Sequence, residues 1–227
     1  MKKIMLSMLL TLCLLFTLLT PAIAAQPAQN NNMVGPTIAE LREMFPNMNL
    51  GDDGYVTDYA LPLTQSMDNF TPVQKIHNAA TNCTLVIYAD GSYSAYGVEP
   101  LSATDGTVGC SGNRVYWNNY ALYYSLNFNV YHSTNSNNYS TITQVGLPVP
   151  QWLGAPGNPN NGSMTAVKSK IVVASQTSVS NCATAYACAL VYLNGVPSFT
   201  MILWADVANG AISPRGTTGT PDWANYN

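Results

Sequence analysis

From Cys83 onward, apolar and polar residues alternate along the chain with a period of two. Such alternation is typical of β-strands that bury one face. Residues 84–89 form a β-branched and aromatic run, Asp90-Gly91 is a hairpin turn signal, and residues 92–98 lead back. We therefore predict a β-hairpin here.

The longest alternation covers residues 115–131 and predicts one long strand. Its even positions are apolar, among them Leu126 and Phe128, whereas odd positions such as Ser125 and Asn127 are smaller or more polar. Because successive side chains of a strand point to opposite faces, we expect the even positions to lie in the core. The odd positions should then form an exposed, Asn-rich face.

Further strands are predicted at residues 139–145, 165–175, 185–193 and 197–207, the last two joined by Asn194-Gly195. Residues 146–162 form a Pro/Gly/Asn-rich loop that contains Trp152. Short strands separated by turn signals indicate an all-β fold. We predict that residues 81–212 form an antiparallel β-sandwich, immunoglobulin-like in its two-layer architecture only.

One or two short helices are predicted before the sandwich, within a helical or irregular segment at residues 36–80. Thr37 and Glu40 form a capping box ahead of Leu41 and other apolar residues that share one helix face. A second helix is expected to begin at Thr71, with Pro72 at its first position. Residues 213–227 are rich in Gly, Thr and Pro, and we expect a flexible tail there.

The first residues have the pattern of an export signal. Lys2 and Lys3 precede an uncharged, Leu-rich run at residues 4–19, and small residues end at Ala24. We expect cleavage after residues 1–24, a polar linker at residues 25–35, and a secreted, extracellular bacterial protein. The alternative, an uncleaved membrane anchor, is disfavoured because the apolar run is shorter than the roughly 20 residues of a spanning helix.

Charge excludes two classes of partner. The chain after Ala24 carries six basic and eleven acidic residues, a net charge of −5. Without a basic stripe, binding to nucleic acid or to an anionic lipid surface is not expected. We also expect no stable membrane insertion after signal cleavage.

Four cysteines remain after the signal, and an even number in an exported chain favours two disulfides. We predict the local pairs Cys83–Cys110 and Cys182–Cys188. Free buried thiols are the alternative.

The candidate catalytic and metal motifs are weak. Gly109-Cys110-Ser111-Gly112 resembles the serine setting of trypsin-like proteases, with His77 and either Asp90 or Asp105 upstream. The spacing from His77 to Ser111 is too short to build the two barrels of such an enzyme, and a triad is defined by geometry rather than order. Hence no catalytic residue and no cofactor are predicted.

An acidic turn contains Asp52, Asp53 and Asp58. Its spacing does not fit a helix–loop–helix calcium loop, because Gly51 and Ala60 would fall at ligand positions. An irregular calcium site and a solvated turn remain the two alternatives, and no metal site is predicted.

The sequence has little charge over most of the predicted sandwich. Only Lys168 and Lys170 are charged between Val115 and Ala205. A surface of amides, hydroxyls and aromatic rings suits neutral glycans, and it also suits lateral strand association, which charge normally opposes. The simplest interpretation, an exported domain adapted to a low-charge surface, is favoured over both.

We therefore expect a non-enzymatic bacterial β-sandwich that binds an extracellular or cell-surface component, either a surface protein or a neutral glycan. A glycan-binding module using exposed aromatic residues is the first alternative, with Tyr116, Trp117 and Trp152 as candidates. A self-associating matrix or toxin-like protein is the second alternative. A small hydrolase is the third and is disfavoured, because no convergent set of titratable groups can be identified.

Overall fold

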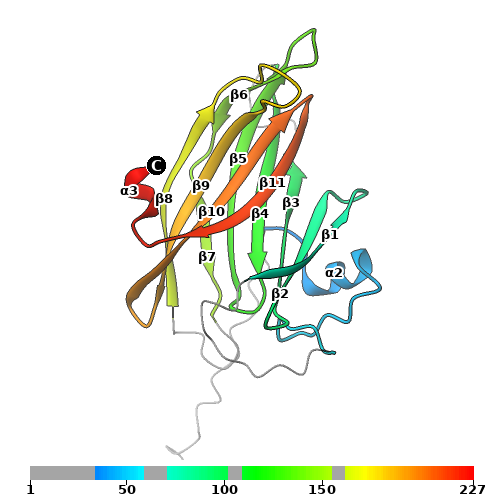
Figure 1. The fold of residues 1–227 in the computed structure, drawn as a ribbon, viewed down its shortest axis with the longest axis vertical. Coiled ribbons are helices and arrows are strands. Elements are labelled where there is room, and N and C mark those ends of the chain that lie inside the picture. Colours follow the sequence, from blue (N-terminus) through cyan, green and yellow to red (C-terminus); the bar gives the residue numbers. More distant parts are fainter. Residues whose placement is uncertain (1–33, 59–70, 102–108, 155–161) are drawn as a thin grey trace, which may run out of the picture. The chain divides into compact units, whose positions relative to one another are not determined.

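The computed structural model describes residues 34–58, 71–101, 109–154 and 162–227, which contain two antiparallel β-sheets (Figure 1). Sheet 1 has the order β1-β2-β3-β4-β5-β6, and β7 pairs with β5 beside β6. Its strands are β1 (Pro72–Asn78), β2 (Cys83–Tyr88), β3 (Tyr93–Pro100), β4 (Ser111–Asn119), β5 (Tyr124–Thr134), β6 (Ser140–Val145) and β7 (Val149–Trp152). Sheet 2 has the order β11-β10-β9-β8, with strands β8 (Gly162–Val173), β9 (Ala183–Leu193), β10 (Val196–Ala208) and β11 (Ala211–Gly219).

The two sheets face each other, which confirms the predicted all-β sandwich. β11 lies against β3 and β4, and β8 lies against β6 and β7. Except for β6 and β7, which both pair with β5, strands that follow one another in the chain are neighbours within each sheet, whereas the immunoglobulin arrangement uses Greek-key connections. The likeness to immunoglobulin domains therefore extends to the two layers and not to the strand order.

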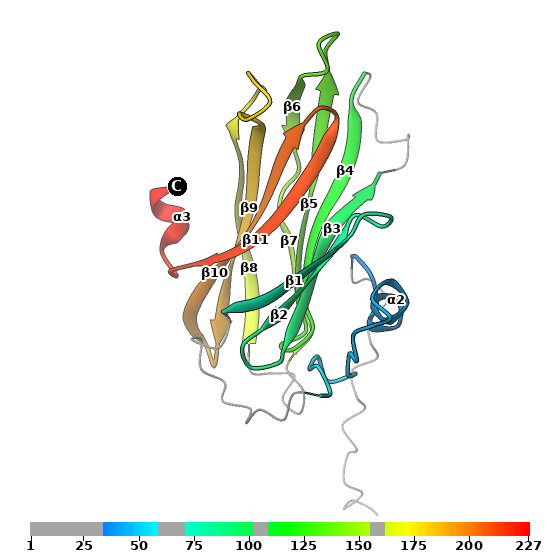
Figure 2. The ribbon, with the colours of Figure 1, turned by 45° about the vertical axis from the view of Figure 1, so that its right-hand side comes forward.

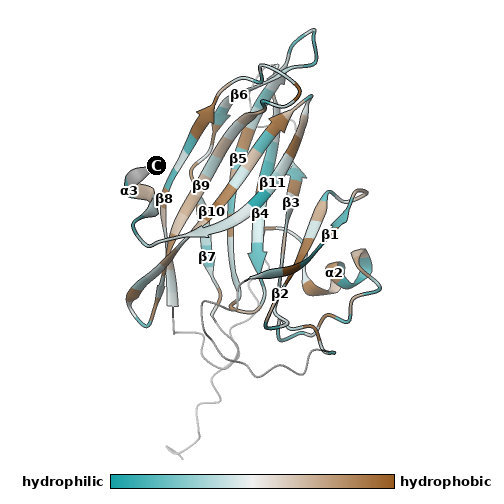
Figure 3. Cartoon of the chain, viewed as in Figure 1, coloured by the Kyte–Doolittle hydropathy of each residue, from teal (hydrophilic) through white to brown (hydrophobic). Residues whose placement is uncertain are grey.

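Large side chains of sheet 1 share the core with small side chains of β9. Trp117 and Phe128 belong to the same buried cluster as the inward-facing alanines of β9. Those alanines are Ala183, Ala185, Ala187 and Ala189. Bands of apolar and polar residues alternate along the strands, as expected when one face of each strand is buried (Figure 3).

A buried glutamine joins the two sheets at one end. Gln176, between β8 and β9, accepts hydrogen bonds through Oε1 from the backbone N–H of Ser140 in sheet 1, at 3.1 Å, and of Asn209 in sheet 2, at 3.0 Å. Its Nε2 donates to the Ser178 carbonyl and to Asn209 Oδ1. A single amide thus satisfies backbone groups from both layers.

The predicted long strand at residues 115–131 is instead two strands, β4 and β5, joined by a tight turn. Asn119 Oδ1 accepts from the Leu122 N–H, and Tyr123 adopts a φ of 45°. Leu126 and Phe128 are fully buried, as predicted. The prediction for the odd positions is wrong at Ser125 and Asn127, because both are buried and Asn127 donates to the Val149 carbonyl of β7.

The first predicted helix is confirmed as α2 (Ile38–Met44). Thr37 and Glu40 form both bonds of the capping box. α2 covers the face of sheet 1 that points away from sheet 2, and its Leu41 packs with Leu85 and Ile87 of β2 (Figure 2). Accordingly, the polar face expected on this side of the sheet is largely a second buried layer.

The second predicted helix is wrong, because the residues after Thr71 form strand β1. Lys75 pairs with Val86 and His77 with Thr84 of β2. These ladder hydrogen bonds, formed with a distant segment, outweigh the local capping pattern. The sandwich consequently begins within the segment assigned to residues 36–80.

The predicted flexible tail at residues 213–227 is also wrong. It forms most of β11 and the short helix α3 (Trp223–Tyr226). Asn209-Gly210, with φ values of 53° and 79°, makes the turn that pairs β11 with β10. This Asn-Gly turn signal is present in the sequence and predicts the hairpin once β10 is placed.

Neither predicted disulfide forms; all four cysteines are thiols. Cys182 directly precedes β9, which contains Cys188, so six residues of extended chain separate them by about 20 Å. Strand register aligns Cys83 of β2 with Gly97 of β3, and Gly97 with Tyr116 of β4. Cys110 comes six residues before Tyr116, so it lies far along the strand direction from Cys83. A disulfide requires Cα atoms within about 7 Å, and the extended strands exclude both pairs.

Candidate functional site

Two of the three predicted binding residues are inside the protein. Tyr116 is 3% exposed and lies on the α2 side of β4, where the pKa of its hydroxyl is raised by burial. Trp117 is 4% exposed and faces sheet 2, with its indole N–H donating to Ser94 Oγ at 3.1 Å. Hence Tyr116 and Trp117 point to opposite faces of β4 and do not form the expected exposed surface.

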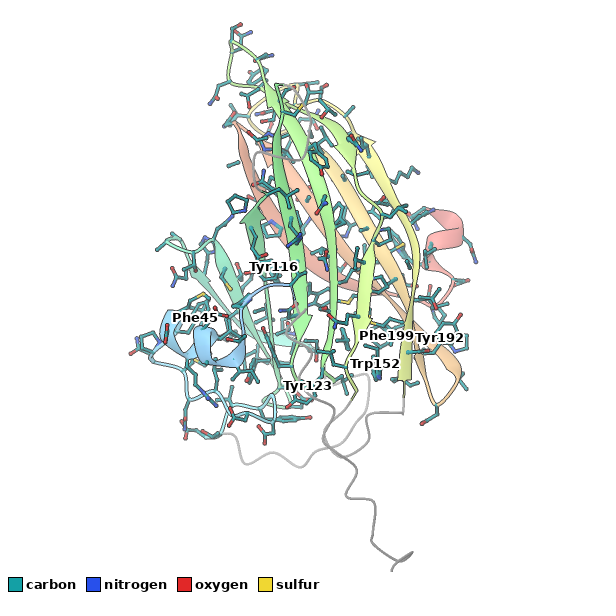
Figure 4. The ribbon with its side chains drawn as sticks, turned by 180° about the vertical axis from the view of Figure 1, so that it is seen from behind. Phe45, Tyr116, Tyr123, Trp152, Tyr192 and Phe199 are labelled. Atoms are coloured by element: carbon teal, nitrogen blue, oxygen red, sulfur yellow. The ribbon has the colours of Figure 1, made fainter. Side chains whose placement is uncertain are left out.

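Trp152 is half-buried on β7, and Figure 4 shows it beside Phe199 and away from Tyr116. Its ring stacks on Tyr124, with centroids 5.8 Å apart and 11° between the planes. Gly162 leaves room for the indole, since a Cβ there would lie 2.4 Å from it. These contacts indicate that Trp152 closes one end of the core.

The weak catalytic motif does not assemble. His77 Nδ1 lies 3.0 Å from Thr84 Oγ1 on the neighbouring strand, and Asp90 accepts from the N–H and hydroxyl of Ser92 in its own turn. Ser111 begins β4 opposite His132 rather than near His77. Asp105 lies outside the described residues.

The acidic turn uses its carboxylates locally. Asp52 pairs with Arg42 at 2.6 Å, Asp53 accepts from the Tyr55 N–H, and Asp58 accepts from Asn49. Within the described ranges, no group of three or more His, Cys, Asp or Glu side chains could hold a metal ion.

A different group of residues, missed in the sequence, gathers on the outer face of sheet 2. Strand register places Lys170, Tyr186, Trp204 and Arg215 in one row across β8, β9, β10 and β11. α3 lies beside β8 (Figure 1), and its Trp223 packs against Tyr186 of this row. We call Tyr186, Trp204, Trp223 and Arg215 the aromatic face.

The rings of the aromatic face are in mutual contact. The ring centroid of Tyr186 lies 5.1 Å from those of Trp204 and Trp223. The centroids of the two tryptophan rings are 6.2 Å apart, and their planes are nearly perpendicular. The Arg215 guanidinium lies 4.4 Å from the Trp204 ring centroid, a cation–π distance. Trp204 is half-buried and Arg215 is exposed, so this part of the cluster reaches solvent.

Polar groups line the same face. Asp206 accepts from Arg215 Nε at 2.9 Å and from the Thr184 hydroxyl at 2.9 Å. The Trp204 indole N–H donates to Thr217 Oγ1 at 3.2 Å. The arrangement places an aromatic ring beside an ion pair and two hydroxyls, a set that can stack on and hydrogen-bond a polar ligand.

The Tyr186 hydroxyl is buried and has no hydrogen-bond partner. The pKa of this group is raised by burial and by the nearby Cys188. A buried hydroxyl without a partner costs on the order of 1–3 kcal/mol and calls for an explanation. It lies in the part of the aromatic face that α3 covers.

A β-bulge explains why the sequence did not reveal this face. The Asn194-Gly195 turn alone would set Tyr186 opposite Leu203, whose side chain belongs to the core. The register shift between Pro197 and Phe199 moves Tyr186 opposite Trp204 instead. The sequence contains Tyr186 and Trp204, but their pairing on one face of sheet 2 depends on the bulge.

No protein-family model matches the chain, and no curated protein does. Among solved structures, a hypothetical protein from Listeria monocytogenes EGD-e is similar at 17% identity, with a TM-score of 0.33. The match covers 66% of this chain and 98% of the Listeria chain. The score is too low to carry a conclusion about fold or function. Within the described ranges, no helix is long and apolar enough to cross a membrane.

Proposed function

We propose that this protein is an exported, non-enzymatic module that binds a saccharide on the aromatic face of sheet 2. The observation that carries the proposal is the half-buried Trp204 beside the Arg215–Asp206 ion pair. The surrounding β-ladder fixes these side chains on a rigid sheet. A preorganised site of this kind loses little entropy on binding.

The chemistry of the face fits a sugar ring. The apolar C–H side of a sugar can stack on an indole, and its hydroxyls can bond to Asp206, Thr217 or Arg215. Among the described hydrogen bonds, Arg215 uses only one of its five N–H donors. The remaining donors can bind ligand hydroxyls while the ion pair stays intact.

Features of the edge strands β1, β8 and β11 argue against the alternative, self-association through edge-to-edge strand pairing. β11 contains Pro214 next to Arg215, and β1 begins with Pro72 and is irregular there. β8 carries two lysines and is bulged at two points along its pairing with β9. Proline, charge and bulges are the usual features that oppose edge-to-edge pairing.

Export is part of the proposal and rests on the signal pattern of residues 1–24. N-terminal sequencing of protein recovered outside the cells should return Ala25. Recovery of a chain that still begins at Met1 would contradict export by this route.

The binding proposal can be tested with a glycan array, followed by calorimetric titration of each saccharide that binds on the array. Replacing Trp204 with Ala should weaken binding by at least tenfold, because the stacking surface is lost. Arg215→Gln should also weaken binding, since ligand hydroxyls lose a donor.

Matched controls separate binding from stability. Trp152→Phe alters a half-buried tryptophan of sheet 1, and Arg42→Gln removes a surface arginine that is also paired with an aspartate. Both should leave the affinity unchanged. Equal effects of Trp204→Ala and Trp152→Phe on binding would reject the aromatic face as the site.

A further inference from the structure

Two lysines lie next to the aromatic face, and in the described part of the chain neither forms an ion pair with an Asp or Glu side chain. Lys168 and Lys170 occupy alternate positions of β8 on the same face, about 7 Å apart along the strand. All three ion pairs in the part of the chain that the structure describes involve arginines instead.

Both ammonium groups bind main-chain oxygens, and the oxygen that Lys168 binds belongs to a neutral peptide carbonyl. Lys168 Nζ donates to the Ala224 carbonyl at 2.6 Å, and Lys170 Nζ donates to the Asn227 oxygen at 2.7 Å. These acceptors belong to residues 220–227, which we call the covering segment. These two hydrogen bonds hold the covering segment against β8, and Figure 1 shows α3 beside that strand.

The outer face of sheet 2 carries an excess of positive charge. Lys168, Lys170 and Arg215 lie there with Asp206 as the counter-charge on the strands, although the chain as a whole has a net charge of −3. Asp222 belongs to the covering segment and would leave with it. The uncovered face would therefore attract an anionic group.

The covering segment is a poor match for what it covers. α3 has four residues, and Asp222 makes no side-chain capping bond. Trp223 and Ala224 remain half-buried, while the Tyr186 hydroxyl beneath has no partner. Trp223 packs on Tyr186, and Lys168, Lys170 and Thr200 each donate one hydrogen bond to the segment. A short element held by these contacts opens at a lower free-energy cost than a strand of the sheet, and opening here would let Tyr186 bind an acceptor.

We propose that the floor beneath α3, formed by Lys168, Lys170 and Tyr186, is a subsite for a saccharide that bears carboxylate groups. The covering segment occupies this subsite as an internal competitor until the ligand displaces it. This inference rests on the proposed saccharide-binding function and adds the charge of the ligand and the position of its anionic group.

The exchange is favourable for a physical reason. A carboxylate on the Lys168 ammonium forms a charge-assisted hydrogen bond, which is stronger than the bond to the neutral Ala224 carbonyl that it replaces. A ligand hydroxyl or ring oxygen can in addition accept from Tyr186 and remove the cost of its unpaired hydroxyl. A neutral saccharide lacks the first of these gains.

The test compares two ligands on the full chain by calorimetry: an α-1,4-linked trigalacturonate and its carboxyl-reduced, neutral form. We expect the trigalacturonate to bind the unmodified protein at least about tenfold tighter. The double variant Lys168→Gln/Lys170→Gln keeps donors for the covering segment but removes both charges, and it should bind the two ligands equally. Lys75→Gln, on β1, is the control and should keep the preference.

Hydrogen exchange supplies a second readout. With trigalacturonate bound, the backbone amides of residues 223–225 should exchange faster with solvent, because the covering segment no longer packs on Lys168, Lys170 and Tyr186. Unchanged exchange at these amides overturns the displacement.

Equal affinity for the two ligands, or a preference that survives in the double lysine variant, overturns the subsite while leaving saccharide binding at Trp204 in place. If neither ligand nor any other saccharide binds, the proposed function fails and this inference fails with it.

Discussion

Tyrosine hydroxyls have a structural role in this protein that its composition does not reveal. Tyr93 donates to the Gly51 carbonyl, and Tyr120 donates to the Pro36 carbonyl. Burial raises the pKa of both hydroxyls. These bonds satisfy carbonyls of the segment around α2, which has few strand partners of its own. The many tyrosines of the sequence suggest a binding surface, but Tyr93 and Tyr120 instead connect sheet 1 to the segment around α2.

Gln176 should be among the most sensitive polar residues. Gln176→Ala leaves the backbone N–H groups of Ser140 and Asn209 without their acceptor at the junction of the sheets. Unpaired buried groups predict a loss of about 2–4 kcal/mol in the free energy of unfolding, measured by urea denaturation.

The matched control for Gln176 is Gln144→Ala, which truncates an exposed glutamine of β6. It should change the free energy of unfolding by less than about 0.5 kcal/mol. Similar losses in the two variants would show that Gln176 does not join the sheets.

His132 should make stability depend on pH. It is buried, its Nδ1 has no partner, and burial lowers its pKa. The unfolded chain then takes up this proton at a higher pH than the folded protein does. The His132 contribution to stability is consequently full above about pH 6.5 and is lost as pH falls below that value towards the folded pKa.

Urea denaturation at a series of pH values tests this expectation. His132→Gln should lose less stability than the unmodified protein between about pH 7 and about pH 5. Gln144→Ala, which leaves both histidines in place, should keep the original slope. Identical slopes for the unmodified protein and His132→Gln would contradict the assignment.

At the scale of elements, strands and turns were predictable where the signals are local. The hairpin at Asp90-Gly91 and the capping box of α2 follow from neighbouring residues, and both are confirmed. The failures concern pairing with distant segments. β1 adopts the strand form because β2 pairs with it, and the bulge in β10 aligns Tyr186 with Trp204. A single sequence carries no direct record of such pairings.

The strand register, which leaves all four cysteines as thiols, and the burial of each one predict how they react with a thiol reagent. In chain beginning at Ala25, iodoacetamide should label the half-buried Cys110 and Cys182 in the native protein. Cys83 and Cys188 are buried and should react only after unfolding. Mass spectrometry without reductant should then count four labels. Fewer than four labels in unfolded protein would indicate a disulfide and contradict the strand register.

At the scale of the whole molecule, the two sheets use their outer faces differently. Sheet 1 buries much of its outer face under the segment that contains α2, through residues such as Leu41 and Tyr93. Sheet 2 carries only the short α3 there in the described part of the chain, beside the exposed Arg215 and the half-buried Trp204. This asymmetry is why the proposed ligand surface lies on sheet 2, although the sequence candidates pointed to sheet 1.

The most direct test is a ¹⁵N NMR titration with a saccharide selected on the array, because the chain has four tryptophans and each indole N–H gives its own signal. The four signals report on separate places: Trp117 in the core, Trp152 on β7, and Trp204 and Trp223 on the aromatic face. Binding on the aromatic face predicts saturable shifts of the Trp204 and Trp223 signals, with those of Trp117 and Trp152 unmoved. A shift of the Trp152 signal while Trp204 stays fixed would contradict the proposed site.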